Sequence, residues 1–202
     1  MIEDPRDVDE PTSTASDEEL LIRHRARGDR SAFEELVHRY ERELYGYLRL
    51  QLGNREAAED VFQQTFLQVH LKCDQFEAGR RLRPWLYTIA THQAIDYKRQ
   101  HARHHLASLD QEMRGLGEED ACSLLDFLEG GEAGPAERVE QMERHAGLHR
   151  ALESLSEDLR ETVRLVYFQG MAYRDAAAAL SIPVGTAKSR VHAAIKKLEG
   201  VC

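Results

Sequence analysis

The sequence predicts an all-α protein made of two small helical domains joined by an acidic linker. Apolar residues recur at the helical period of about 3.6 residues, and no segment alternates convincingly as a half-buried strand does. Glycine and proline gather in the middle of the chain and separate two helical blocks. With 202 residues, 42% of them hydrophobic, the chain can build packed cores in one or two small domains.

The first helical block opens with two predicted helices. Ser16 and Glu19 have the spacing of a capping box, which predicts a short helix ending near Gly28. A second helix is expected over residues 31–52, where apolar residues fall at i, i+3 and i+4. Gly53 is placed to end it, because glycine readily adopts the left-handed conformation of a helix C-terminus.

Two more helices are expected in the same block. Asn54 can cap a third helix over residues 55–71, since its side chain can accept a hydrogen bond from the first turn. Pro84 suits the first position of a fourth helix, which is expected to reach about residue 103.

The second block is expected to hold four helices. One covers residues 140–152, and Ser156 opens the next, which Gly170 ends. The last two helices, 173–180 and 184–198, are separated by a three-residue turn, which is the layout of a helix-turn-helix. The inward face of the helix after Ser156 is expected to carry Leu159, Val163, Val166 and Tyr167.

Charge is distributed unevenly along the chain. The formal net charge of −9 argues, taken as a whole, against a nucleic-acid partner. Residues 1–19 carry −7 and residues 104–144 carry −8, which leaves +6 on the remainder. The acidity therefore belongs to a predicted leader and linker, and the predicted folded parts are mildly basic.

Several protein classes are excluded or disfavoured by simple patterns. The chain has no run of about 18 apolar residues, so no membrane span is expected, and Met1–Glu10 lacks the apolar core of a signal peptide. Three distant cysteines do not predict a disulfide scaffold. No metal site and no cofactor are expected, because His101, His104 and His105 have no cysteine or carboxylate partners at ligand spacing.

The final predicted helix divides into an apolar face and a basic face without acids. Such a helix can lie in a DNA major groove, with its first residues on base edges and its later lysines on phosphates. An ordinary solvated basic face has the same pattern, but the alanine-rich run 175–180 before it would let two helices cross closely, which favours DNA binding. The inward set is Val184, Ala187, Val191, Ala194, Ile195 and Leu198, and the outward set is Thr186, Lys188, Ser189, Arg190, His192, Lys196 and Lys197.

A second basic constellation lies in residues 79–105. It interleaves Trp85, Tyr87 and Tyr97 with cations, a combination suited to melted nucleic acid, whose bases stack and whose phosphates need neutralising. The alternative is that these aromatic residues belong to the core. The cations are Arg80, Arg81, Arg83, Lys98, Arg99 and Arg103, against the single acid Asp96.

Three segments carry a resemblance to bacterial sigma factors. They are Ala57–Leu67 (AAEDVFQQTFL), Arg83–Asp96 (RPWLYTIATHQAID) and Met171–Arg190 (MAYRDAAAALSIPVGTAKSR). Residues 31–103 resemble sigma region 2 and residues 145–199 resemble region 4. With no domain between them, the chain is similar to the extracytoplasmic-function (ECF) group of the sigma-70 family.

The resemblance implies a division into domains and a set of partners. It implies a leader at 1–16, region 2 at 17–105, a linker at 106–137 and region 4 at 138–202. The implied partners are the RNA polymerase core, through its β′ clamp helices and β flap, promoter DNA, and an anti-sigma factor. The polymerase contacts would be Asp60, Gln63, Gln64 and Phe66. The −10 contacts would be Arg80, Arg81, Arg83, Thr88, Thr91, His92 and Arg99, and the −35 contacts Thr186, Lys188, Ser189, Arg190, His192 and Lys196.

The chain departs from the family pattern at four of these positions. Gln64 stands where an acid is usual, Thr91 where an arginine is usual, and His92 where an asparagine is usual. Ser181 replaces the usual glycine of the helix-turn-helix turn, which predicts a slightly strained turn.

The acidic linker is expected to follow the basic RNA path of the polymerase as an RNA mimic, with a solvated spacer as the alternative. The function expected from the sequence is promoter recognition and DNA opening for RNA polymerase in the bacterial cytoplasm, with no catalysis by the chain itself. A stand-alone helix-turn-helix regulator using residues 145–199 is the alternative, and it leaves the motifs of residues 31–103 unexplained. A helical metal hydrolase has no supporting ligand spacing.

Overall fold

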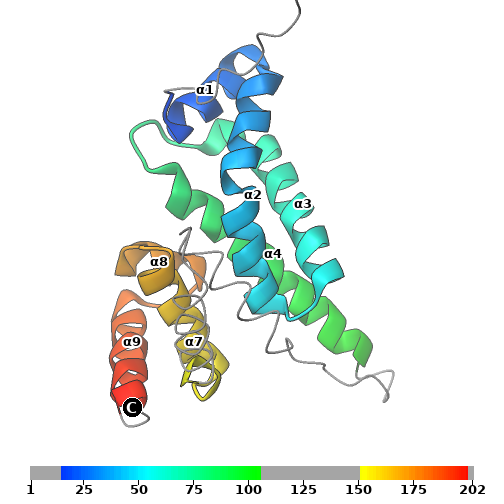
Figure 1. The fold of residues 1–202 in the computed structure, drawn as a ribbon. Coiled ribbons are helices and arrows are strands. Elements are labelled where there is room, and N and C mark those ends of the chain that lie inside the picture. Colours follow the sequence, from blue (N-terminus) through cyan, green and yellow to red (C-terminus); the bar gives the residue numbers. More distant parts are fainter. Residues whose placement is uncertain (1–14, 106–150, 200–202) are drawn as a thin grey trace, which may run out of the picture.

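The computed structural model describes residues 15–105 and 151–199, and all regular secondary structure there is helical, which confirms the all-α prediction. The leader, the linker and most of the helix expected at 140–152 lie outside the described residues. Figure 1 shows helices α7–α9 gathered against the domain formed by α1–α4. The helices are α1 (Asp17–Arg27), α2 (Arg30–Leu52), α3 (Arg55–Lys72), α4 (Leu82–His105), α7 (Glu157–Val163), α8 (Tyr173–Ala179) and α9 (Val184–Glu199).

The ends of α1 and α2 confirm the local predictions. The Ser16 hydroxyl accepts a hydrogen bond from the Glu19 N–H (3.2 Å), and the Glu19 carboxylate accepts one from the Ser16 N–H (2.8 Å), which completes the capping box. Gly28 and Gly53 end the two helices with φ of 63° and 70°. Residues other than glycine adopt this left-handed backbone conformation at an energetic cost.

The start of α4 differs from the prediction by one half-turn. Asn54 caps α3 as expected, accepting a hydrogen bond from the Ala57 N–H (3.3 Å). Helix α4 begins at Leu82, whose N–H donates to the Glu18 carboxylate of α1 (2.8 Å), so Pro84 is its third residue. Proline is tolerated there because the first N–H groups of a helix have no intrahelical acceptor.

Helix α2 is the centre of the first domain and packs against α1, α3 and α4. The loop before α4 is held by Phe76, which is buried and stacks edge-on against Trp85 with ring centroids 5.3 Å apart. No described helix is long and apolar enough to cross a membrane. The largest fully buried side chains of this domain are Leu20, Leu21, Leu36, Leu44, Leu48, Thr65, Val69, Leu82, Leu86 and Tyr87.

Helix α7 continues into a π turn, Arg164–Phe168, that the sequence did not predict. Ser156 precedes α7 as expected, although its side chain makes no cap hydrogen bond. The Gln169 N–H donates to the Arg164 carbonyl (3.0 Å), five residues back, which defines the wider turn. The wider turn shifts the phase of later side chains, so Tyr167, expected to face inward, is 59% exposed.

Helices α8 and α9 form the predicted helix-turn-helix. Ser181 in the turn has φ of 55°, the left-handed conformation that a non-glycine residue rarely adopts. The next residue, Ile182, donates its N–H to the Ala177 carbonyl (3.0 Å) and closes the end of α8. The strain expected from the missing glycine therefore lies at Ser181.

Replacing Ser181 with glycine is expected to stabilise the protein by about 0.5 to 1 kcal/mol, because relief of the left-handed conformation outweighs the extra entropy of an unfolded glycine. Urea unfolding followed by circular dichroism would measure the gain. A Ser154→Gly variant is the control, since a glycine gives no conformational advantage outside the left-handed region. A loss of stability in Ser181→Gly would contradict the inference that the backbone is strained at Ser181.

Candidate nucleic-acid interface

The outward face of α9 is formed by four of the six residues predicted to read DNA. Lys188, Ser189, His192 and Lys196 are exposed, and their spacing places them on one side of the helix. The opposite side, with buried Ala187, packs on α7 and α8. The result is an open, uncompensated surface of two lysines, a histidine and a hydroxyl.

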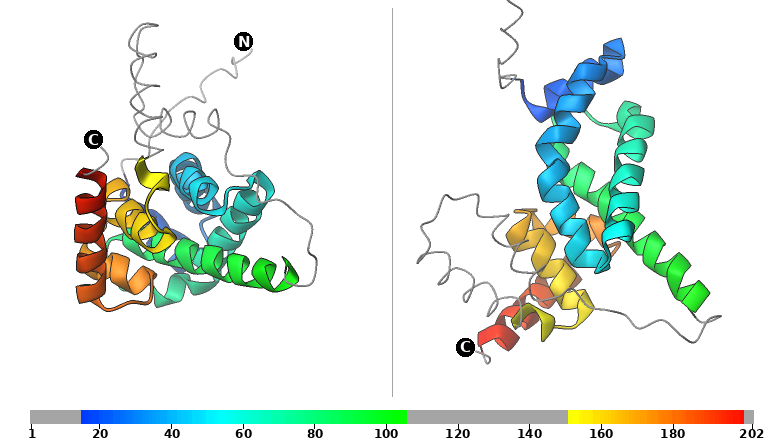
Figure 2. Two further views of the ribbon diagram at one scale, coloured as in Figure 1. Left: turned by 90° about the horizontal axis from the view of Figure 1, so that it is seen from below. Right: turned by 45° about the vertical axis from the view of Figure 1, so that its right-hand side comes forward.

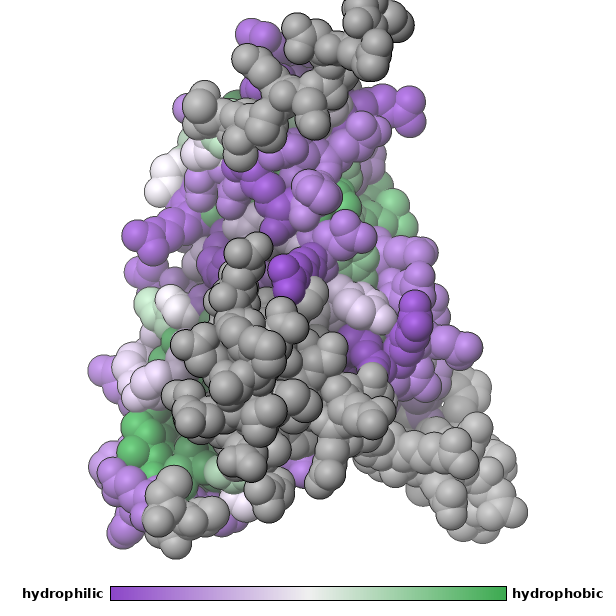
Figure 3. Space-filling model, in the orientation of Figure 1, coloured by the Kyte–Doolittle hydropathy of each residue, from purple (hydrophilic) through white to green (hydrophobic). Residues whose placement is uncertain are grey.

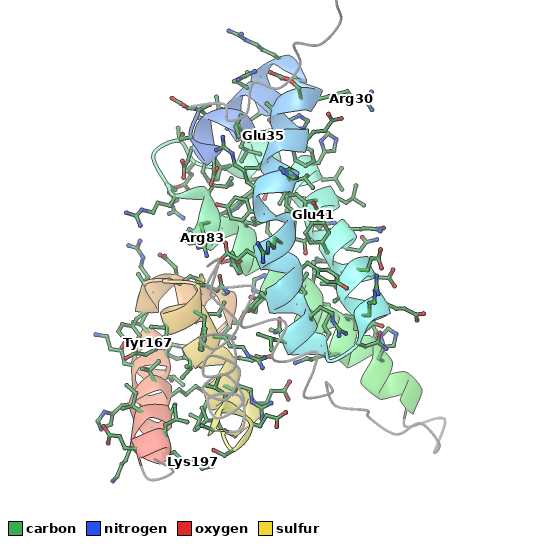
Figure 4. All side chains as sticks on the ribbon, in the orientation of Figure 1. Arg30, Glu35, Glu41, Arg83, Tyr167 and Lys197 are labelled. Carbon is green, nitrogen blue, oxygen red and sulfur yellow. The ribbon has the colours of Figure 1, made fainter. Side chains whose placement is uncertain are left out.

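The remaining cations of α9 turn toward α7 instead. Arg190 donates to the Asp158 carboxylate (2.7 Å), and Thr186 is half-buried. Lys197 donates to the Ser154 carbonyl (2.8 Å), near the end of α9 in Figure 4. Val184 was expected to pack inward, which is wrong: it is exposed, because it begins the helix before α9 reaches its neighbours.

On α4, the predicted DNA contacts divide between two sides. Thr88, His92 and Arg99 recur at spacings of four and seven residues and share one side of α4, and Arg81 immediately precedes the helix. Arg81 and Arg99 are exposed, while Thr88 and His92 are half-buried. The His92 Nε2 is buried and has no hydrogen-bond partner among the described residues. On this side of α4, the His92 Nε2 therefore remains to be satisfied, whereas the Thr88 hydroxyl already bonds the Pro84 carbonyl.

Thr91, predicted to contact DNA, is not accessible to a ligand in this structure. Thr91 is fully buried, because it lies on the side of α4 that faces α2. Its hydroxyl lies 2.9 Å from the Tyr47 hydroxyl and 2.7 Å from the Tyr87 carbonyl. Burial raises the pKa of Tyr47, so its phenol stays protonated and can donate.

Replacing Thr91 with valine is expected to destabilise the protein by about 1 to 3 kcal/mol, because the buried Tyr47 hydroxyl loses its partner. Thermal unfolding would measure the loss. Thr88→Val is the matched control, since the half-buried Thr88 hydroxyl bonds only the Pro84 carbonyl of its own helix (2.7 Å). Equal effects of the two substitutions would contradict the role given to the hydroxyl pair.

Arg83 is engaged within the protein. Its guanidinium pairs with the Glu43 carboxylate of α2 and also donates to the Gln169 side chain (3.0 Å) and the Gln169 carbonyl (3.2 Å). It lies 5.3 Å from the centre of the Tyr87 ring, close enough for a cation–π contact. In Figure 4, Arg83 lies between α2 and the second domain.

Of the three interleaved aromatic residues, Tyr87 is fully buried and belongs to the core. Trp85 and Tyr97 are half-buried and pack against the same core, and Tyr97 stacks on His101 with ring centroids 3.8 Å apart. Tyr87 is therefore a core residue, which is the alternative given above for these aromatic residues. Trp85 and Tyr97 remain partly exposed to solvent.

The loop before α4 is positioned by α1, a role that the sequence did not suggest. Arg25 of α1 donates to the Phe76 carbonyl (3.0 Å), and Glu18 of α1 accepts from the first N–H of α4. Gly79, with φ of 90°, makes the bend between them.

Arg80 in this loop is exposed and pairs only with nearby Glu77 (2.7 Å). Helix α1 thus holds Arg80 and Arg81 at the start of α4.

Helix α3 presents the surface predicted to contact a protein partner. Asp60, Gln63 and Gln64 are exposed on one side of it. Phe66, predicted as a fourth contact, is only 6% exposed and packs against the rings of Phe33 and Phe62. Phe66 therefore belongs to the core in this structure and is not presented with the other three side chains.

Two leucines outside the predicted contacts extend the same side of α3. Leu67 is 48% exposed and Leu71 is 62% exposed, and both fall at helical spacing from Asp60 and Gln64. Figure 3 shows an apolar patch over α3, the helix that carries them. The sequence pattern could have indicated this exposure, because neither leucine belongs to the line of apolar residues that α3 buries.

Electrostatics also link the two domains. Lys98 of α4 donates to Glu157 and to Glu161 (3.1 Å) of α7, and its hydrogen bond lowers the pKa of the Glu157 carboxyl. Arg164 is buried nearby, and loss of hydration lowers its pKa to about 10. Within the described part of the chain, no group of three His, Cys, Asp or Glu side chains could hold a metal ion.

Two family descriptions match the chain in the order of its two domains. Sigma-70 region 2 matches residues 36–104, and Sigma-70, region 4 matches residues 145–198. The first match contains α3 and α4, and the second contains the helix-turn-helix. Each candidate surface therefore lies inside a matched region.

Characterised relatives match over nearly the whole chain. The RNA polymerase sigma factor CarQ of Myxococcus xanthus is 33% identical over 171 residues, covering 85% of this chain and 89% of CarQ. The ECF RNA polymerase sigma factor SigW of Bacillus subtilis is 28% identical over 178 residues, covering 86% of this chain and 92% of SigW.

Solved structures show the same fold. CnrH, solved in complex with the cytosolic domain of CnrY, is 25% identical with a TM-score of 0.58, covering 92% of this chain and 96% of CnrH. The sigma factor RpoE of Bartonella quintana, solved with the anti-sigma factor NepR, is 24% identical with a TM-score of 0.59 and covers 84% and 95% of the two chains.

Proposed function

This chain belongs to the ECF group of the sigma-70 family, and from that membership we propose how its surfaces share the work of promoter recognition. As an ECF sigma factor it binds the RNA polymerase core and directs transcription initiation, and it is not an enzyme. What remains to be assigned is which residues contact which partner.

We propose that α9 reads the −35 element in the major groove. The observation that supports this is the open face formed by Lys188, Ser189, His192 and Lys196. Ser189 and His192 supply hydrogen-bonding groups for base edges, while the two lysines can neutralise phosphates. Thr186 and Arg190, on the flank toward α7, would contact the groove edge, with Arg190 leaving Asp158 to do so.

We propose that the start of α4 and its preceding loop capture the melted −10 strand. Arg80, Arg81 and Arg99 are exposed, and Thr88 and His92 lie on the same side of α4 as Arg99. Half-buried Trp85 can stack on an unpaired base from this position. Arg83 would join them once its bonds to Gln169 are broken.

We propose that the side of α3 carrying Asp60, Gln63, Gln64, Leu67 and Leu71 docks on the β′ clamp helices. Exposed leucines flanked by polar groups are typical of a contact surface for another protein. The β flap would receive region 4. The acidic linker, outside the described residues, is proposed to follow the RNA path of the polymerase.

We also propose regulation by an anti-sigma factor, supported by the fold likeness to RpoE, which was solved with the anti-sigma factor NepR. The protein would act in the cytoplasm, where the polymerase and the chromosome are.

Initiation in a defined mixture tests this assignment. The full chain is combined with core polymerase and a promoter library, and transcripts are mapped to find the promoters it selects. Specific initiation that requires both promoter elements supports the proposal that α9 reads the −35 element and α4 binds the −10 element. Tight binding of the free chain to duplex DNA without any initiation would favour a stand-alone helix-turn-helix regulator instead.

A further inference from the structure

Val184, the first residue of α9, is an apolar side chain that the fold leaves uncovered. It is 40% exposed, whereas Ala187 and Val191, one and two turns further along the helix, are at most 2% exposed. Its neighbours Pro183 and Gly185 are also exposed, and a Cβ placed at Gly185 would meet no other described atom within 4 Å. Among the described residues, the first turn of α9 is therefore open to solvent.

Neither packing nor helix formation accounts for a valine at this position. Valine is β-branched and forms helices less readily than alanine or glutamate, and the partial positive charge at the start of a helix favours an acid. The other two helices of the second domain follow that preference, with Glu157 and Asp158 in the first turn of α7 and Asp175 in that of α8. The first turn of α9 contains no acid. It therefore lacks the charge that would repel DNA and presents an apolar group instead.

Val184 also lies in line with the proposed DNA-reading face of α9. Lys188, His192 and Lys196 follow it at intervals of four residues, and all three are exposed. Side chains of a helix tilt toward its N-terminus, so Val184 projects ahead of the first turn. The left view of Figure 2 shows α9 along an outer edge of the molecule, with the other helices on its inner side. A helix that enters the major groove by its first residues would bring Val184 to the base edges.

The major groove offers one base-edge feature that suits an apolar side chain. All four bases present hydrogen-bonding groups there, and thymine alone adds a methyl group, at C5. A polar base edge covered by valine would lose its bound water without gaining a hydrogen-bond partner, which weakens binding. The complement of Val184 in the groove is therefore a thymine methyl group.

We propose that Val184 is a specificity-determining residue, which selects an A·T pair in the −35 element through the methyl group of its thymine. This inference rests on the proposed function, because it requires that α9 enters the major groove of that element. It adds one apolar contact to the polar and basic contacts assigned above. It also explains why a valine that the sequence pattern assigned to the core is exposed.

The test removes the two partners of this contact separately and together. A promoter that the native chain selects with core polymerase is prepared with each thymine of its −35 element replaced in turn by deoxyuridine, which lacks the methyl group and keeps the base pair. Each promoter is combined with holoenzyme that contains the native chain, Val184→Ala, Val184→Ile or Lys197→Ala. Abortive RNA synthesis at increasing holoenzyme concentration separates the promoter affinity from the rate of DNA opening.

In the native holoenzyme, deoxyuridine at one position is expected to lower the promoter affinity about fourfold, which is the effect of losing one buried apolar group of this size. Val184→Ala should lower the affinity for the unmodified promoter by about the same factor. It should then be insensitive to deoxyuridine at that position, because both changes remove the same contact. The rate of DNA opening should stay the same in every case.

The controls separate this contact from folding and from the charge of α9. Val184→Ala should keep the native unfolding midpoint, because the side chain is exposed and alanine is a strong helix former. Val184→Ile keeps an apolar side chain and should keep the preference for thymine. Lys197→Ala should also keep that preference, because the Lys197 ammonium is bonded to the Ser154 carbonyl.

Two results would overturn the proposal. Equal sensitivity of the native and Val184→Ala holoenzymes to deoxyuridine at every position would show that Val184 touches no thymine methyl group, and any effect of Val184→Ala would then come from a contact with the polymerase. A selected −35 element without an A·T pair would exclude the contact directly. Failure of the proposed function is a different result, namely that the native holoenzyme initiates at no promoter, or initiates equally well when the −35 element is scrambled.

Discussion

Replacing both Leu67 and Leu71 with glutamate is expected to abolish initiation by removing the contact with core polymerase. The two side chains are the most exposed leucines described, and they continue the line of Asp60 and Gln64 along α3. Charges at the apolar centre of an interface typically weaken binding by 2 kcal/mol or more, which is about 30-fold in affinity. Fluorescence anisotropy of the labelled chain titrated with core polymerase would measure the loss.

The controls separate the contact from folding. Neither leucine belongs to the buried core, so the unfolding midpoint of the double variant should match that of the native chain. Ala26→Glu introduces an acid at an exposed position of α1 and should leave polymerase affinity unchanged. Native affinity in the double variant would refute the assignment of this side of α3 to the polymerase.

Replacing Lys188 and His192 with alanine is expected to lower initiation at promoters that need their −35 element by about 10- to 100-fold, because one phosphate contact and one base contact are lost. Core binding should be unchanged, since α3 is far from α9 in the chain and does not pack on it. Transcript yield from the selected promoters, with and without a scrambled −35 element, would measure the effect.

Lys197→Ala is the matched control for this experiment. It removes the same charge from the same helix, but the Lys197 ammonium is bonded to the Ser154 carbonyl on the side toward α7. Its loss should change initiation by about twofold at most. If Lys197→Ala lowers initiation as much as the double variant does, then initiation depends on the net charge of α9 and not on its outward face.

Local sequence signals predicted the local structure well. Ser16, Asn54, Gly28 and Gly53 define helix ends where expected, because a cap depends on a few neighbouring residues and their hydrogen bonds. The helix-turn-helix and the strained Ser181 are likewise local features.

The structure differs from the predictions where tertiary packing determines the direction of a side chain. The π turn after Val163 adds a residue to one turn and moves Tyr167 outward, which a constant helical period does not foresee. Thr91 and Phe66 were assigned to surfaces by resemblance, but the direction of a side chain depends on which side of its helix meets α2. The docking of α8 on α4 joins residues about 80 positions apart, so no local pattern reports it.

The hydroxyl pair of Tyr47 and Thr91 fixes how α4 is rotated about its own axis. Any turn of the helix would separate the two buried hydroxyls and leave the Tyr47 hydroxyl without its partner in the core. The outward positions 88, 92 and 99 are therefore presented at constant angles, whatever side chains occupy them. At this proposed −10 surface, substitution of one position is therefore expected to change base preference at that position without moving the others.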